Sequence, residues 1–144
     1  MEEIYQITSA LKFLPWGSQV PVLTDGRFSG VSTGACIGHI GPEALAGGPI
    51  GCLRDGDIID IVIDRNQLEG QVHFVAARDA VTPSRAKSAL EERGPHPDLK
   101  PHPSLPGDTR LWAALQTVSG GTWAGAVYDV DRIVRALEMR KYNG

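Results

Sequence analysis

Glycine and proline are distributed very unevenly along this 144-residue chain. Eight of the 17 glycines fall within residues 26–51, and five of the ten prolines fall within residues 95–106. Glycine clusters permit tight turns and close backbone approach, whereas proline clusters exclude helix and internal strand. The clusters predict one domain over residues 1–144 with three parts: a β-rich part (1–79), a connector (80–108) and a helical part (109–144).

Apolar runs predict the strands of the first part. Residues 20–24 (VPVLT) are rich in β-formers and are predicted to be a buried strand. Residues 58–63 (IIDIVI) carry the strongest strand pattern in the chain. A polar turn separates them from a further strand at residues 71–75, so these two strands predict a β-hairpin.

Apolar spacing and end signals predict several helices, at residues 8–14, 41–46, 84–93, 110–118 and 130–141. Asp129 can cap the last of these helices. Between the third and fourth helices the sequence PHPDLKPHPSLPGD predicts an extended strap over the surface. Strands and helices together predict an α+β fold.

Composition excludes several classes of function. The chain has 14 Lys and Arg against 17 Asp and Glu and shows no basic stripe, which argues against nucleic-acid and anionic-membrane partners. No apolar run is long enough to span a bilayer, and the start MEEIYQ does not resemble a secretory signal. Cys36 and Cys52, the two cysteines, lack the spacing of a zinc or iron–sulfur site. We therefore expect a cytoplasmic protein with reduced thiols.

Residues 24–40 (TDGRFSGVSTGACIGHI) hold most of the chemistry-bearing side chains. Glycines at every fourth position from 26 to 38 let backbone N–H groups approach an anion. Arg27 can clamp a carboxylate or phosphate, and Ser29 lies at a strand exit where a base or nucleophile can sit. His39 is predicted to be packed and hydrogen-bonded. Their spacing alone favours a structural glycine-rich turn with hydrogen-bonded hydroxyls over a functional site.

Four motifs in order, TDGRFSG, IGHIGPEA, GGPIG and DGDIIDI, resemble the C-terminal domain of the dihydroxy-acid dehydratase/6-phosphogluconate dehydratase family. The opening MEEIYQITSALKFLPWG is similar to the sugar-acid branch, typified by D-xylonate dehydratases. The same holds for HPDLKPHPSLPGDTRLWAALQTVSGGTWAGAVYDVDRIV. The resemblance covers nearly the whole chain.

The resemblance implies a swivelling β-barrel-like (β/β/α) domain with flanking helices, similar to the mobile domain of aconitase. In that family it packs on a larger N-terminal domain, with the active site between the two. The enzymes are hydro-lyases that convert a 2,3-dihydroxy acid into a 2-keto acid. They use a divalent metal, usually Mg²⁺, which can stabilise the enolate. They also use an iron–sulfur cluster, whose iron can withdraw the C3 hydroxyl.

The resemblance also assigns residues. It implies that Ser29 is the base and that Glu3 is a magnesium ligand, aligned through the shared Thr-Ser-Ala-Leu at residues 8–11. It implies substrate binding by four residues of the glycine-rich segment: Arg27, Gly30, Ser32 and Thr33. Val31 stands where some members have Thr, which leaves open whether Ser32 or Thr33 supplies the second hydroxyl.

In this family the cluster cysteines and the other metal ligands lie in the N-terminal domain. The resemblance therefore implies a C-terminal portion that is inactive alone, needs that domain as its partner and forms a homo-oligomer. Two alternatives stay open: a non-catalytic binding domain, and a portion of a branched-chain dihydroxy-acid dehydratase. The sugar-acid character of residues 96–134 argues against the second alternative.

Overall fold

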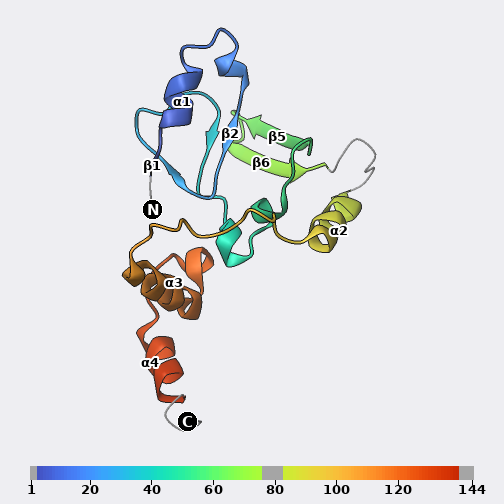
Figure 1. Cartoon of the computed structure of the whole chain (residues 1–144). Coiled ribbons are helices and arrows are strands. Elements are labelled where there is room, and N and C mark those ends of the chain that lie inside the picture. The colour runs from blue at the N-terminus through green and yellow to red at the C-terminus, as the bar shows by residue number, and fades with distance from the viewer. Residues whose placement is uncertain (1–2, 76–82, 140–144) are drawn as a thin grey trace.

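The computed structural model describes residues 3–75 and 83–139 (Figure 1). The strands are β1 (Glu3–Ile4), β2 (Val22–Leu23), β3 (Arg27–Phe28), β4 (Cys36–Ile37), β5 (Ile59–Asp64) and β6 (Glu69–Phe74). The α-helices are α1 (Gln6–Leu11), α2 (Pro83–Arg93), α3 (Gly107–Ser119) and α4 (Val130–Met139). The 3-10 turns are η1 (Gly17–Gln19), η2 (Ala44–Ala46), η3 (Pro49–Cys52) and η4 (Gly121–Ala124).

The described strands form three two-stranded sheets. β1 pairs in parallel with β3, and β2 pairs in parallel with β4. β5 and β6 form the antiparallel hairpin, with Ile59 opposite Phe74, so the hairpin prediction is confirmed. The strand predicted at residues 20–24 is shorter, Val22–Leu23, and is half-buried rather than buried. The barrel-like arrangement implied by the family resemblance stays a prediction.

Three predicted helices are confirmed as α2, α3 and α4. Asp129 caps α4, because its Oδ1 accepts the Arg132 N–H at 3.0 Å. The prediction that this helix reaches residue 141 extends beyond the described residues. The helix predicted at 8–14 ends at Leu11, and the one predicted at 41–46 is wrong. Only the turn Ala44–Ala46 forms there, since Glu43 is extended and Gly47 is left-handed.

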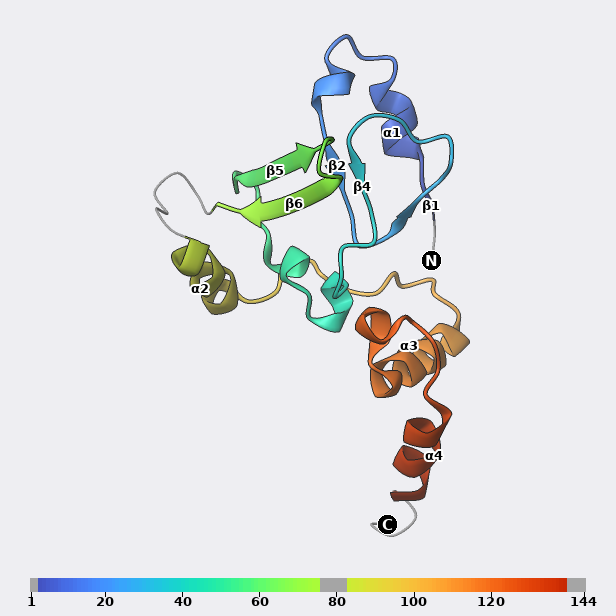
Figure 2. The ribbon, with the colours of Figure 1, turned by 180° about the vertical axis from the view of Figure 1, so that it is seen from behind.

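The proline-rich strap joins α2 to α3 and crosses the glycine-rich segment (Figures 1 and 2). The His96 N–H donates to the Gly51 carbonyl at 2.7 Å. Leu99 packs so closely on Gly51 that a Cβ there would lie 3.1 Å from its Cδ2. Gly51 therefore provides the space in which the strap rests.

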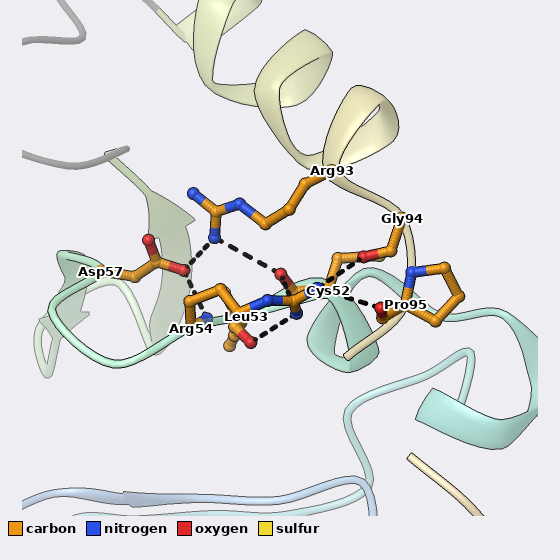
Figure 3. Close-up of polar contacts among 7 residues, drawn as sticks. All are labelled: Cys52, Leu53, Arg54, Asp57, Arg93, Gly94 and Pro95. Atoms are coloured by element: carbon orange, nitrogen blue, oxygen red, sulfur yellow. Dashed lines mark hydrogen bonds and ion pairs between the residues drawn. The ribbon is translucent and has the colours of Figure 1, made fainter. Parts of the chain in front are cut away.

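A cluster of polar contacts, the clasp, fastens the C-terminal end of α2 to the turn before β5 (Figure 3). Arg93 Nη1 lies 2.5 Å from Asp57 Oδ2, which also accepts the Arg54 N–H at 2.7 Å. The Arg54 guanidinium donates to the carbonyls of Gly94 and Pro95 at 3.3 and 2.9 Å. Burial alone would raise the pKa of Asp57, but the hydrogen bonds and charges of Arg93 and Arg54 outweigh it and hold that pKa below its usual value.

We expect the Asp57 carboxyl to titrate below the ordinary value of 3.8, as followed by carbon NMR of the side chain. Its lowered pKa means that the clasp contributes fully above the unfolded-state pKa and is lost as pH falls through the folded-state value. Arg93→Ala should move the midpoint upward. Arg65→Ala, at an exposed arginine between β5 and β6, is the control and should leave the Asp57 midpoint unchanged. A normal Asp57 midpoint in the unmodified chain would contradict the clasp.

Apolar surface is covered sparsely. The chain exposes 11,224 Å², whereas a compact protein of 15.4 kDa exposes roughly 7,200 Å². Among the described residues, Ala86 and Leu90 are the only buried hydrophobic side chains. Large apolar side chains are exposed on all parts of the chain, including Phe13, Trp16, Ile63, Leu68, Trp112, Trp123, Val134 and Leu137. No helix among the described residues is long and apolar enough to cross a membrane.

Candidate functional site

The parallel pairing of β1 with β3 brings the two ends of the predicted site together. Glu3 lies opposite Arg27 in the register, so their Cα atoms are about 4.8 Å apart. Ser29 follows two residues after Arg27, at most about 6.6 Å further along the chain. The register therefore brings Glu3 beside Arg27, and Ser29 follows just beyond the paired residues of β3.

Glycines allow β3 to sit where it does. A Cβ at Gly38 would lie 3.1 Å from the Phe28 ring, and one at Gly26 would lie 3.3 Å from Ile4 Cδ1. The hydroxyl of Thr24, a buried residue, accepts the Gly26 N–H at 2.9 Å. Phe28 and Ile4 therefore pack closely against positions that lack side chains, at the strand pair that carries Arg27.

Ser29 is half-buried and begins a tight turn. Its carbonyl accepts the Ser32 N–H at 3.0 Å, and its Oγ accepts the Val31 N–H at 3.3 Å. A backbone donor on Oγ favours the anionic form of the hydroxyl, which a base requires. A Cβ at Gly30 would meet nothing within 4 Å, so a ligand can approach the turn on that side.

The hydroxyls of Ser32 and Thr33, which the resemblance also assigns to substrate binding, lie in different surroundings. Ser32 Oγ lies 3.3 Å from the Ile4 carbonyl and 3.1 Å from Oγ1 of Thr8, which is 1% exposed. Ser32 therefore ties the loop to the start of α1. Thr33 is exposed and lines an open pocket of about 370 Å³ together with Lys12 and Ser18. Arg27 and Ser29 do not line this pocket.

A second loop, residues 39–44, braces the turn that leads into β3. The His39 N–H donates to the Gly26 carbonyl at 2.9 Å, and the Ala44 N–H donates to Asp25 Oδ2 at 2.8 Å. Glu43 Oε1 accepts a hydrogen bond from the Thr122 hydroxyl. The prediction that the His39 side chain is packed is wrong: the residue is exposed, with a left-handed φ of 54°.

Asp25 and Glu43, whose carboxylates accept these hydrogen bonds, were not among the residues predicted for the site. The signal was available, since each is an acidic residue inside one of the motifs, TDGRFSG and IGHIGPEA. The glycine spacing of these motifs does not indicate which loops pair. The hydrogen bond between the Ala44 N–H and Asp25 could therefore not be derived from spacing.

The family resemblance implies a magnesium ion and an iron–sulfur cluster, which need several ligands close together. Within residues 3–75 and 83–139, no group of three or more His, Cys, Asp or Glu residues lies within reach of one ion. Cys36 and Cys52 are free thiols on different elements, β4 and η3. The described residues do not fit a cluster, and Glu3, the magnesium ligand that the resemblance implies, would supply one carboxylate.

Comparison with known proteins gives a consistent picture. The profile of the family "Dihydroxy-acid/6-phosphogluconate dehydratase C-terminal" matches residues 1–99. D-xylonate dehydratase YagF of Escherichia coli is 58% identical over 142 residues, which are 98% of this chain and 22% of that protein. D-xylonate dehydratase YjhG of the same organism is 61% identical over 140 residues, 95% of this chain and 21% of that protein.

Dihydroxy-acid dehydratase 2 of Mesorhizobium japonicum is 47% identical over 88 residues, 61% of this chain and 14% of that protein. The chain thus spans about a fifth of the length of the D-xylonate dehydratases that it matches. No solved structure matches it.

Proposed function

The chain belongs to the dihydroxy-acid/6-phosphogluconate dehydratase family, and we propose that it is the C-terminal part of a sugar-acid hydro-lyase. Its reaction would convert an aldonic acid such as D-xylonate into a 2-keto-3-deoxy acid. The observation that carries this proposal is the strand register that sets Glu3 beside Arg27, two residues before Ser29. Similarity over nearly the whole chain to two D-xylonate dehydratases favours a sugar acid over a branched-chain acid.

In this proposal Ser29 Oγ removes the proton from C2 of the substrate. The C3–O bond then breaks as the hydroxyl takes that proton from Ser29 Oγ and leaves as water, which returns Ser29 to its anionic form. The resulting enol gains a proton at C3 and loses one from its C2 hydroxyl to become the 2-keto acid. The Val31 N–H, 3.3 Å from Ser29 Oγ, supports the negative charge that the base carries before it takes the proton. Arg27 would bind the substrate carboxylate through its guanidinium, and the open side of Gly30 and the exposed Thr33 would face the sugar hydroxyls.

The metal chemistry would come largely from outside these residues. Membership of the family is consistent with metal cofactors, and we propose Mg²⁺ and an iron–sulfur cluster for the complete enzyme. Glu3 would add one carboxylate to the magnesium site. Since the described residues bring no three potential ligands together, the cluster would be held entirely by the partner domain.

The exposed apolar surface supports that partner. The chain exposes about 4,000 Å² more than a compact protein of this mass, which is more than the roughly 1,000–2,500 Å² that one partner contributes to an obligate interface, so a partner accounts for part of the excess. We propose that an N-terminal dehydratase domain covers this surface, and that complete enzymes associate as homo-oligomers. Two free thiols are consistent with a cytoplasmic enzyme.

A hybrid enzyme tests the proposal: this chain replaces the matching 142-residue region of E. coli YagF. We expect 2-keto acid formation from D-xylonate with kcat within about tenfold of that of the parent enzyme, which corresponds to a loss of at most about 1.4 kcal/mol of transition-state stabilisation. A branched 2,3-dihydroxy acid should be turned over much more slowly.

A folded hybrid with full cofactor content that does not dehydrate D-xylonate would contradict the sugar-acid proposal. If that hybrid dehydrated the branched acid instead, the branched-chain alternative would replace it. Binding of D-xylonate without turnover of either acid would favour the binding-domain alternative.

A further inference from the structure

The C-terminal segment touches the loop at residues 39–44 through Thr122 of η4. The Thr122 hydroxyl donates to Glu43 Oε1, and both residues are half-buried. A Cβ at Gly41 would lie 3.4 Å from Thr122 Cγ2 and 3.6 Å from its Cβ, so the threonine side chain lies over the glycine. In both views, the orange end of α3–η4 lies beside the teal segment that carries this loop (Figures 1 and 2).

The same loop is bonded on its other side to the turn that begins β3. The Ala44 N–H donates to Asp25 Oδ2, and the His39 N–H donates to the Gly26 carbonyl. Arg27 follows at once. A continuous path of hydrogen bonds and covalent bonds therefore runs from Thr122 to the strand that carries the proposed site.

We propose that Thr122 is a positioning residue, which holds the 39–44 loop against Asp25 and Gly26 so that β3 presents Arg27 and Ser29 in a fixed place. The proposal rests on the proposed function. Its chemical basis is a neutral hydroxyl donating to a carboxylate, which is stronger than a neutral pair. Among the described residues, this hydroxyl is the one side-chain donor that Glu43 receives from the C-terminal segment.

The comparisons limit how general this role is. The family profile ends at residue 99, whereas the alignment with E. coli YagF covers 98% of the chain and so includes Thr122. The match to the M. japonicum dihydroxy-acid dehydratase covers 61% of the chain. The contact therefore joins a segment outside the family profile to a loop inside it.

The hybrid enzyme with Thr122→Val and with Thr122→Ser tests the proposal. Valine keeps the shape and removes the donor. We expect exchange of the His39 and Ala44 amides to become about tenfold faster and kcat to fall about tenfold with KM changed less than about twofold, the effect of losing one charge-assisted hydrogen bond. Thr122→Ser should restore both. Thr117→Val, in the same segment but with its hydroxyl bonded to the Ala113 carbonyl, is the matched control.

Three results would overturn the proposal: no effect of Thr122→Val on these amides, failure of serine to restore them, or equal acceleration of the amides of the β5–β6 hairpin. The last result would show a general structural role. An unmodified hybrid that lacks activity would contradict the proposed function instead, and amide exchange would still decide whether Thr122 orders the loop.

Discussion

Replacing Ser29 with alanine in the hybrid enzyme is expected to lower kcat for D-xylonate by about a thousandfold, the usual scale for loss of a general base. The Oγ that is proposed to remove the C2 proton is gone, and Ser32 in the same turn cannot substitute, because its hydroxyl is bonded to the Ile4 carbonyl. Folding should be little affected, since Ser29 Oγ accepts one hydrogen bond, at 3.3 Å and on the exposed side. Initial rates of 2-keto acid formation are the measurement.

The control for this experiment is Ser104→Ala, an exposed serine of the strap. It should keep the activity of the unmodified hybrid. If Ser29→Ala retained more than about a tenth of the activity, the loss would be too small for a general base. Ser29 would then be a turn residue, which is the alternative that the glycine-rich sequence left open.

The second large effect concerns the chain on its own. We expect the isolated chain to bind a hydrophobic dye such as ANS several times more strongly than the hybrid does, because it exposes about 4,000 Å² more surface than a compact protein of its mass, including many large apolar side chains. Its three tryptophans, which are 53%, 60% and 76% exposed, should emit as in water and be quenched by acrylamide. In the hybrid this quenching should fall.

Both readouts compare the same 144 residues with and without the remaining part of the enzyme, so the hybrid is the control. An isolated chain that is monomeric, binds no dye and shields its tryptophans would contradict the proposed partner domain. It would support a free-standing binding domain.

Local patterns predicted local structure well. The hairpin and three helices followed from apolar spacing and caps, which act within a few residues. That Glu3 lies near the glycine-rich segment could be expected only from the family resemblance, because a parallel pair of two-residue strands has no pattern that predicts its partner.

Other features could not be derived from the chain alone. Residues 58–63 have the composition of a buried strand, yet Ile63 is 62% exposed. Such apolar positions match the proposal that a partner covers them. The contact of Thr122 with Glu43 joins residues 79 positions apart, and neither belongs to a periodic pattern.

The shortness of β1 and β3 has a consequence for the order in which the enzyme becomes competent. Pairing of two residues on each strand closes a loop of more than twenty residues. Very few hydrogen bonds therefore offset the backbone entropy that is lost when this loop closes. A junction of this kind forms late and opens easily. On this account, the proposed partner domain would dock first, and Ser29 would acquire its working geometry only in the complete enzyme.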